Sequence, residues 1–153
     1  MEERESLKGN LLVASPALLD PNFRRTVVLV TEHTDEGAMG LVLNRAADVV
    51  LAQFDDPGDA AAVVIGDVGF MSAETDPADL ERGTRRVRAF AGYAGWGAGQ
   101  LEEELEEESW IVEPALPDDP FTPDPDGLWS EVLRRKGGRY ALVATMPLDP
   151  SLN

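Results

Sequence analysis

Residues 26–44 read Thr26-Val27-Val28-Leu29-Val30-Thr31-Glu32-His33-Thr34-Asp35-Glu36-Gly37-Ala38-Met39-Gly40-Leu41-Val42-Leu43-Asn44. The first part, 26–32, is rich in β-branched residues, which are enriched in strands. A second apolar run, 39–44, follows after Asp35-Glu36-Gly37, whose composition is typical of a turn. Two strands joined by so short a loop pair most simply as an antiparallel hairpin. The sequence therefore predicts a β-hairpin over these residues.

The flanking sequence predicts further strands on both sides of this hairpin. An unbroken apolar run such as 61–65 is typical of a strand in the centre of a sheet. A weaker alternation before the glycines at 92–99 predicts a strand that leads into a turn at Gly92. The strands expected outside the hairpin cover residues 7–14, 61–65, 86–90, 110–112 and 140–145.

A few short helices are expected between these strands: over 49–54, from Gly99 onward, and after Asp124, where Pro125 suits the first helical position. Residues 76–82 are expected to be irregular or a single helical turn. The segment 114–125 holds five prolines and is expected to form a rigid surface connection. Without a regular βαβ alternation, this order predicts an α+β fold: a single compact domain over 1–153 with a mixed, largely antiparallel sheet and a few short helices.

The last expected helix has a clear apolar face and clear ends. Arg134, Arg135 and Lys136 complement the helix dipole at its C-terminus, and Gly137-Gly138 ends it. The apolar face consists of Leu128, Trp129, Val132 and Leu133.

The second informative stretch is Gly92-Tyr93-Ala94-Gly95-Trp96-Gly97-Ala98-Gly99-Gln100-Leu101-Glu102-Glu103-Glu104-Leu105. Glycine is used where the backbone takes a positive φ or approaches another group closely. The four glycines therefore predict a tight turn that presents Tyr93 and Trp96 as a recognition surface. The helix that follows carries its own carboxylates in the first turn, where an anion would otherwise bind. A phosphate-binding loop is therefore not indicated.

The net charge of −16 is unevenly distributed and limits the classes of partner. Residues 89–133 carry 12 acidic side chains and no basic one. Affinity for DNA comes largely from Lys and Arg side chains that displace counterions at phosphates, and a negative field slows the approach of a nucleic acid. We therefore expect a protein or a small molecule as the partner, and no direct binding to nucleic acid.

Hydropathy and cysteine content predict a soluble cytoplasmic protein. No apolar stretch approaches the ~20 residues that span a bilayer, so no membrane association is expected. The N-terminal Met1-Glu2-Glu3-Arg4-Glu5 lacks the basic start and the apolar core of a signal peptide. The chain contains no cysteine, which excludes disulfides and thiol chemistry and agrees with a reducing compartment.

His33 is the single histidine of the chain. Because it lies among carboxylates, in Glu32-His33-Thr34-Asp35-Glu36, a general base or a metal ligand is one interpretation. Metal sites need three or four ligands, and this segment offers no second histidine or cysteine. The chain also lacks the Gly-x-Ser-x-Gly elbow of a serine hydrolase. We favour a structural histidine that hydrogen-bonds to a turn, and expect no metal and no cofactor.

Polar and aromatic residues near the hairpin and in the glycine-rich stretch form the candidate ligand or partner surface. The arginines and the asparagine that flank the hairpin strands either converge on an anionic ligand or cap the strand ends. No catalytic residue is assigned. The candidate surface consists of Arg24, Arg25, His33, Asn44, Arg45, Tyr93, Trp96 and Gln100.

Several segments together resemble the AlgH/YqgE family of bacterial proteins. The resemblance covers residues 7–45 and 92–152, and its motifs are long, ordered and specific. They are Gly9-Asn10-Leu11-Leu12-Val13-Ala14-Ser15-Pro16, Asp20-Pro21-Asn22-Phe23-Arg24-Arg25-Thr26-Val27-Val28-Leu29, His33, Gly37-Ala38-Met39-Gly40-Leu41-Val42-Leu43-Asn44-Arg45, Gly92-Tyr93-Ala94-Gly95-Trp96, Gln100-Leu101-Glu102, Trp110, Phe121 and Leu128-Trp129.

The resemblance implies a compact α+β domain built on a mixed, largely antiparallel sheet. Members of the family carry the label of transcriptional regulator, and their biochemical activity is not established. Two features of this chain differ from the family pattern. Gly66-Asp67-Val68 replaces the usual Gly-Gly-Pro-Val after the central strand, and the region 70–88 is shorter and lacks the family's second histidine segment.

The sequence favours a non-catalytic regulatory or adaptor protein that binds a protein or a small ligand through residues 92–100. Glycine and aromatic residues are concentrated there without a catalytic set. The alternative is an enzyme that acts on a small anionic substrate with His33 as base, assisted by Arg25 or Asn44. Direct DNA binding, which the family label implies, is disfavoured by the charge.

Overall fold

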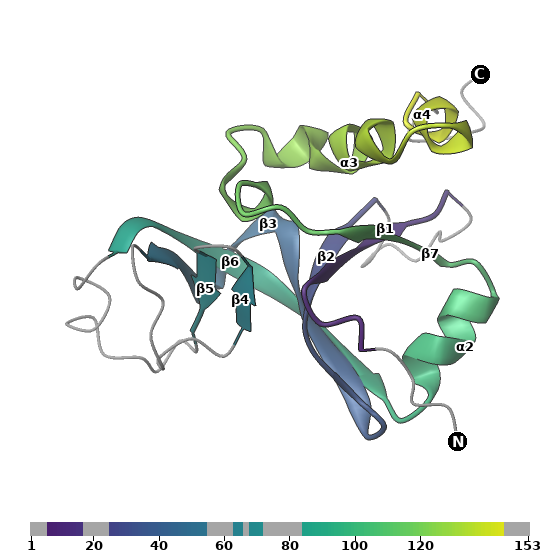
Figure 1. Cartoon of the computed structure of the whole chain (residues 1–153), viewed down its shortest axis with the longest axis horizontal. Coiled ribbons are helices and arrows are strands. Elements are labelled where there is room, and N and C mark those ends of the chain that lie inside the picture. Colours follow the sequence, from purple (N-terminus) through teal and green to yellow (C-terminus); the bar gives the residue numbers. More distant parts are fainter. Residues whose placement is uncertain (1–5, 17–24, 55–62, 66–67, 72–83, 146–153) are drawn as a thin grey trace.

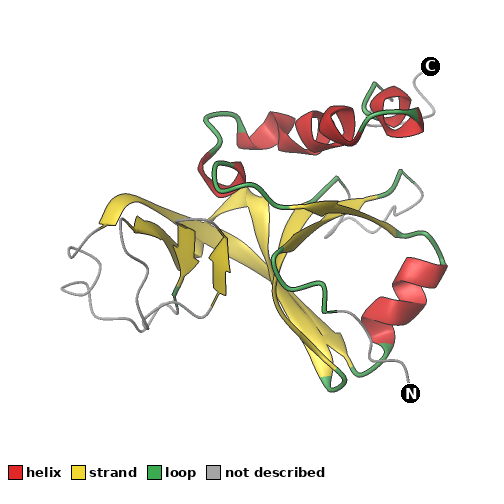
Figure 2. Ribbon diagram, in the orientation of Figure 1, coloured by secondary structure: helices red, strands yellow, loops and turns green. Residues whose placement is uncertain are grey.

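The computed structural model describes residues 6–16, 25–54, 63–65, 68–71 and 84–145. It confirms the α+β class (Figures 1 and 2). The strands are β1 (Asn10–Ala14), β2 (Val27–Thr34), β3 (Gly37–Phe54), β4 (Val63–Ile65), β5 (Val68–Phe70), β6 (Thr84–Gly97) and β7 (Trp110–Pro114). The helices are α2 (Gln100–Glu106), α3 (Leu128–Lys136) and α4 (Arg139–Val143), with 3-10 turns η2 (Asp119–Phe121) and η3 (Pro125–Gly127).

Two long strands, β3 and β6, pass through two antiparallel sheets (Figure 1). The strand order is β4-β5-β3-β2-β1-β7, and β6 pairs with β3. One sheet contains β6, β3, β2, β1 and β7, and the other contains β6, β3, β5 and β4. The register of β3 against β6 shifts between Val42 and Ala46 and again between Ala46 and Val49. These shifts mark the place where the pair leaves one sheet and enters the other.

The predicted hairpin over residues 26–44 is confirmed, and its alternation divides the interior into two cores. Val27 and Leu29 pack on one face of β2, whereas Val28 and Val30 pack on the other, because successive strand side chains point to opposite faces. Helices α3 and α4 lie over the first face and α2 lies over the second (Figure 1). The five-stranded sheet is therefore the middle of three layers.

Helix α3 buries the apolar face that the sequence predicts, and one of its side chains ties it to the sheet. The indole Nε1 of Trp129 donates a buried hydrogen bond of 2.7 Å to the carbonyl oxygen of Ala14. The guanidinium of Arg25 lies 4.3 Å from the centre of the Trp129 ring. Full burial of such a side chain contributes ~1.5–3 kcal/mol, so this face accounts for most of the attachment of α3. Its buried residues are Leu128, Trp129, Val132 and Leu133.

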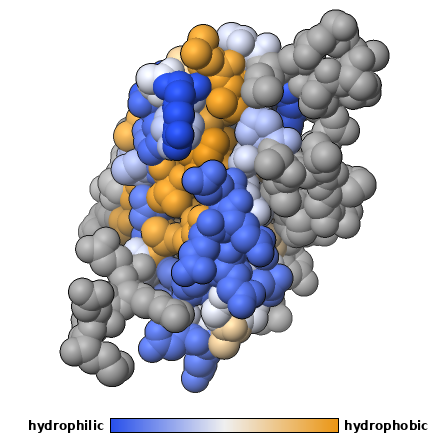
Figure 3. Space-filling view, turned by 90° about the vertical axis from the view of Figure 1, so that its right-hand side faces the viewer, coloured by the Kyte–Doolittle hydropathy of each residue, from blue (hydrophilic) through white to orange (hydrophobic). Residues whose placement is uncertain are grey.

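Helix α2 packs on the sheet through a narrow apolar stripe and presents carboxylates outward. Leu101 is fully buried and Leu105 packs partly against the same core. Figure 3, which views the molecule from the side of α2, shows hydrophilic residues gathered over the lower half of that face. Like charges four residues apart on a helix each cost ~0.2–0.5 kcal/mol, so docking on the sheet must stabilise α2. Its exposed acids include Glu103, Glu106, Glu107 and Glu108.

The proline-rich strap, residues 114–125, is held against β6 by two arginines. Arg88 donates hydrogen bonds to the carbonyl oxygens of Pro120 at 3.2 Å and Thr122 at 2.6 Å. The guanidinium of Arg86 lies 4.3 Å from the centre of the Phe121 ring. Since proline offers no backbone donor, side chains of neighbouring elements supply much of the strap's attachment.

A partly buried ion pair joins the strap to α3. Arg135 donates two parallel hydrogen bonds, of 2.8 and 2.9 Å, to the carboxylate of Asp119, which is 6% exposed. The same carboxylate accepts a 2.7 Å hydrogen bond from the amide of Leu116. These hydrogen bonds with Asp119 raise the pKa of Arg135, and the nearby carboxylate of Glu113 adds to the effect.

Two predicted elements are of the wrong type. Residues 49–54, predicted as a helix, form the second half of β3, where Leu51 pairs with β5 on one side and β6 on the other. A helix of six residues has little stability of its own, so pairing on both sides determines the conformation. Residues 140–145, predicted as a strand, contain α4 instead. Tyr140, Val143 and Ala144 pack against the α3 side at the spacing of one helix face.

Two further predictions are wrong about where an element lies, one along the chain and one within the sheet. The turn expected at Gly92 is wrong, because β6 continues to Gly97 and the backbone takes a positive φ in this stretch at Gly99, where φ is 78°. The strand expected over 61–65 is described only for Val63–Ile65 and lies at the end of the strand order, outside the centre. The prediction for 76–82 lies outside the described residues.

We predict that Asp119→Asn lowers the free energy of unfolding by about 2 kcal/mol, because it removes the nearer of the two carboxylates that pair with the partly buried Arg135. Urea unfolding monitored by tryptophan fluorescence measures the change. Asp118→Asn is the matched control, since the Asp118 side chain is 86% exposed and its ion pair contributes little. Equal effects of the two substitutions would contradict the assigned role of Asp119.

Candidate functional site

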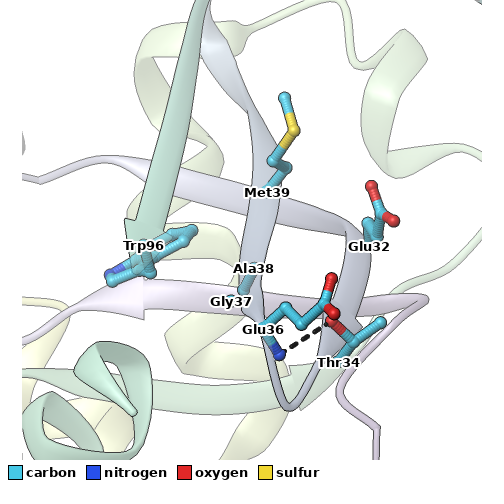
Figure 4. Close-up of a pocket in the computed structure, with 7 residues that line it drawn as sticks. All are labelled: Glu32, Thr34, Glu36, Gly37, Ala38, Met39 and Trp96. Carbon is cyan, nitrogen blue, oxygen red and sulfur yellow. Dashed lines mark hydrogen bonds between the residues drawn. The ribbon is translucent and has the colours of Figure 1, made fainter. Parts of the chain in front are cut away.

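A hollow of about 190 Å³ lies at the tip of the β2–β3 hairpin (Figure 4). We call it the hairpin-tip hollow. The tip extends beyond the part of the sheet that α3 and α4 cover (Figure 1). The residues that line it come from β2, the turn, β3 and β6, and are Glu32, Thr34, Glu36, Gly37, Ala38, Met39 and Trp96.

The strand register explains why few side chains project from the sheet beside this hollow. Met39 is paired with Glu32 on one side and Gly95 on the other. One step further along, Gly37 is paired with Thr34 and with Gly97. Paired residues of antiparallel strands present their side chains on the same face. On this face, the residues of β6 opposite Met39 and Gly37 are therefore two glycines.

The fold requires some of these glycines and not others. Gly37 has a φ of 142°, and a Cβ atom there would overlap the carbonyl oxygen of Trp96. A Cβ atom on Gly40 would overlap Val28 and lie 2.7 Å from the carbonyl oxygen of Leu29. Gly95 has no positive φ, and a Cβ atom there would have nothing within 4 Å. Within the described part of the chain, neither strain nor packing explains glycine at position 95.

The rim of the hollow combines carboxylates with an exposed apolar side chain. Glu32 and Glu36 are exposed, and neither carboxylate forms a hydrogen bond or an ion pair within the described part of the chain. Met39 is 46% exposed. Thr34 Oγ1 accepts a 3.1 Å hydrogen bond from the amide of Glu36, which shapes the turn. The rim is therefore negatively charged with an apolar wall.

His33 lies on the opposite face of the same hairpin and fastens three segments together. Its Nδ1 accepts a 2.9 Å hydrogen bond from the amide of Leu7, so its proton lies on Nε2. Nε2 lies 3.2 Å from Glu102 on α2. The His33 side chain is 6% exposed. Both ring nitrogens are thus engaged inside the protein, which is the structural role that the sequence favours.

Trp96 and Gln100 meet at one carboxylate of α2. Glu104 Oε1 accepts hydrogen bonds from the indole nitrogens of Trp96 at 3.1 Å and Trp110 at 2.9 Å. The two indole rings pack edge to face, with 5.9 Å between their centres. Gln100 donates a 3.2 Å hydrogen bond to Oε2 of Glu104 and accepts one of 3.0 Å from the amide of Gly97. This cluster fixes the end of β6 beneath the hollow.

The remaining residues of the predicted surface do not join the hollow. Asn44 accepts a hydrogen bond from the amide of Val27 at 3.1 Å and donates one of 2.8 Å to the carbonyl of Arg25, whose φ is 56°. Arg25 lies eight positions before His33 along the chain, which is roughly 25 Å of extended backbone. Arg45 is exposed beside Asn44.

The two remaining members of the predicted surface are Tyr93 and Arg24. Tyr93 lies opposite Leu41 in the β6–β3 register, and its side chain lies outside the described part. Arg24 lies outside the described residues altogether. The described members of the predicted set fall into a group at the hairpin tip and a group at the other end of the strands.

A larger cleft of about 590 Å³ borders the proline-rich strap, and sequence reasoning missed it. Two ion pairs within the chain lie along it: Arg86 lies 2.7 Å from Asp118, and Arg135 binds Asp119. Phe121 lies beneath the guanidinium of Arg86. The five prolines were the only sequence signal for this region, and they do not specify which element the strap contacts.

Two kinds of feature are absent from the described part of the chain. No three His, Asp or Glu side chains come together there in a way that could hold a metal ion. Among the same residues, no helix is both long enough and apolar enough to cross a membrane.

Comparison with known proteins places the whole arrangement in a family. A profile of the AlgH-like family matches residues 11–66 and 62–141. UPF0301 protein SCO2948 of Streptomyces coelicolor is 42% identical over 190 aligned positions, covering 100% of this chain and 98% of that protein. A UPF0301 protein of Chlorobaculum parvum is 36% identical and covers 99% of this chain and 98% of its own length.

Two solved structures have the same fold. The crystal structure of protein DIP2367 from Corynebacterium diphtheriae matches with a TM-score of 0.80 at 26% identity, covering 95% of each chain. The solution structure of the AlgH protein from Pseudomonas aeruginosa matches with a TM-score of 0.68 at 26% identity, covering 96% of this chain and 98% of that one. The chain belongs to the AlgH-like family.

We predict opposite effects of two glycine substitutions. Gly40→Ala should lower the free energy of unfolding by about 1–3 kcal/mol, because its Cβ overlaps Val28. Gly95→Ala should leave stability unchanged or raise it by up to ~1 kcal/mol, because alanine restricts the unfolded chain without a clash. Denaturant unfolding of both variants tests the pair. A loss on Gly95→Ala as large as that on Gly40→Ala would show that the fold needs glycine at both sites.

Proposed function

We propose that this member of the AlgH-like family is a non-catalytic regulatory or adaptor protein that binds another protein through the hairpin-tip hollow. The observation that carries the proposal is Gly95. Glycine within a strand costs roughly 0.5–1 kcal/mol relative to alanine, and no positive φ or close neighbour in the described part of the chain requires it at this position. Strand glycines without an internal cause often mark the close approach of a ligand or another backbone.

The hydrogen bonds that His33 already forms within the protein support a binding function over a catalytic one. A general base needs a nitrogen or oxygen within reach of the substrate proton. Both ring nitrogens of His33 are already hydrogen-bonded, to Leu7 and Glu102. An enzyme that used His33 as base on an anionic substrate would have to break one of these hydrogen bonds and bring the anion beside Glu102.

The volume of the hollow supports a protein partner over a metabolite. Small-molecule sites usually enclose roughly 300–1,000 Å³, whereas this hollow measures about 190 Å³. That space suits one side chain of a larger partner. The cleft beside the strap is within the usual range, at about 590 Å³, but Asp118 and Asp119 already pair with its arginines.

The negative charge of the rim also argues against direct binding to nucleic acid. Glu32 and Glu36 face outward beside the hollow, and a phosphate backbone would meet them directly. Affinity for DNA depends on cationic contacts at phosphates. A regulatory role of this protein would therefore act through another protein.

We predict that Gly95→Val abolishes ligand binding at the hollow while the protein stays folded. The valine side chain would occupy open space on the face of Met39 and block close approach. The measurement is amide NMR of the labelled chain, titrated with short peptides that carry basic, acidic or apolar side chains. Bound peptides should shift the amide signals of Met39, Gly95 and Gly97 in the native protein only.

Leu116→Ala is the matched control, because Leu116 is 47% exposed and lines the cleft beside the strap. It should leave peptide binding unchanged. Peptides that shift the amides of Arg86 and Phe121, and that lose affinity on Leu116→Ala but not on Gly95→Val, would move the site to that cleft. A titration in which no peptide shifts any amide would also count against the proposal.

A further inference from the structure

We infer that the hairpin-tip hollow holds a lysine or arginine side chain presented by an exposed segment of a different protein. The inference rests on the proposed function and specifies the chemistry of the partner. Three features of the hollow determine it: the carboxylates on the rim, the apolar wall and the bare glycine backbone beside them.

The carboxylates of Glu32 and Glu36 provide the charge complement. They come from β2 and from the turn, so they approach the hollow from two directions (Figure 4). Neither is neutralised within the described part of the chain. A cationic head group between them would form charge-assisted hydrogen bonds, which are stronger than neutral ones. An acidic or neutral side chain would gain no such contact.

The exposed side chain of Met39 provides the apolar complement. It stands beside the hollow and is 46% exposed. Methionine adapts its shape to a contacting surface. Lysine and arginine pack their methylene stems on apolar groups and keep the charged end in a polar environment. The pairing of Met39 with Glu32 across the strands offers both kinds of contact side by side.

The backbone of β6 allows the partner's main chain to come close. Gly95 and Gly97 are exposed and present no side chain on the face of the hollow. A Cβ atom at Gly97 would have one neighbour within 4 Å, Oε1 of Gln100 at 3.9 Å. A segment that carries a basic side chain can therefore lie against β6 without a clash.

The charge of the surrounding surface favours a basic partner and disfavours a second copy of this chain. Residues 89–133 carry 12 acids and no base, and α2 presents its carboxylates outward. Such a field steers cationic partners toward the protein. Two copies of the chain would bring like charges together, which costs affinity. The occupant is therefore a segment of another protein with a net positive charge.

The test is an NMR titration of the full chain with three capped peptides that differ at the central position. Their sequences are Val-Thr-Lys-Thr-Val, Val-Thr-Arg-Thr-Val and the same peptide with norleucine, which has the four-carbon stem of lysine without its ammonium group. The lysine and arginine peptides should bind about tenfold more tightly than the norleucine peptide at about 0.1 M salt, where charges more than ~10 Å apart are screened. The amides of Met39, Gly95 and Gly97 should report the binding.

The decisive variant is Glu32→Gln with Glu36→Gln. It should reduce the affinity for the lysine peptide about tenfold, to that of the norleucine peptide, and leave the norleucine peptide unchanged. Glu103→Gln with Glu106→Gln changes the net charge equally on α2 and should alter the lysine affinity by less than about twofold, because distant exposed charges are screened.

The outcomes separate this inference from the proposed function. If all three peptides bind equally and Gly95→Val removes all of them, the hollow binds peptides and the preference for a basic side chain is wrong. If the α2 variant weakens lysine binding as much as the rim variant, the attraction is a property of the whole acidic surface and the inference fails. If no basic peptide shifts the hairpin amides, the inference fails as well.

Discussion

The pairing of β3 with β6 is the interaction on which both sheets depend. It begins at Gly37 opposite Gly97 and continues to Phe54 opposite Thr84, with the register shifts near Ala46 allowing the pair to bend from one sheet into the other. The pair closes tightly at the hairpin end, since a side chain on Gly37 would overlap the backbone of Trp96. The hollow lies where this paired end extends past α3 and α4, whereas α2 is attached to the other face of the same end (Figure 1).

The helices on the two faces of the sheet are attached to it by different interactions. Those on the α3 side stabilise the fold, whereas those on the α2 side support the candidate binding site. On the α3 side, apolar burial and the Trp129–Ala14 hydrogen bond hold the helix, and Arg135 with Asp119 joins it to the strap. On the α2 side, polar contacts fasten a short acidic helix through Glu102 and Glu104. His33 and Trp96, whose side chains offered the predicted surface the most chemical functionality, form hydrogen bonds in this second attachment. They support the hollow from below and leave its contacts to Glu32, Glu36 and Met39.

Local patterns in the sequence predicted the elements whose side chains alternate clearly. The hairpin over 26–44 and the buried face of α3 could be predicted because period two and period 3.6 are visible there. Residues 49–54 and 140–145 could not, because short apolar runs are compatible with strand and helix, and their partners lie far away in the chain. The hollow could not be predicted either. It depends on Gly95 and Gly97 being brought beside Met39 by a pairing between residues more than fifty positions apart.

The glycines at 92–99 show that a sequence pattern can mark an informative segment and still predict the wrong backbone geometry for it. Their concentration predicted a turn that presents aromatic rings, whereas the strand is extended and Trp96 is buried beneath it. Gly37 and Gly40 are explained by overlap, and Gly99 by its positive φ. Gly95 has neither cause, and the carboxylates beside it lack partners in the described chain. A folded chain is expected to break local rules mainly where function requires it. Gly95 is such a departure, and it lies beside exposed carboxylates that a partner could reach, which is the combination on which the proposed binding function rests.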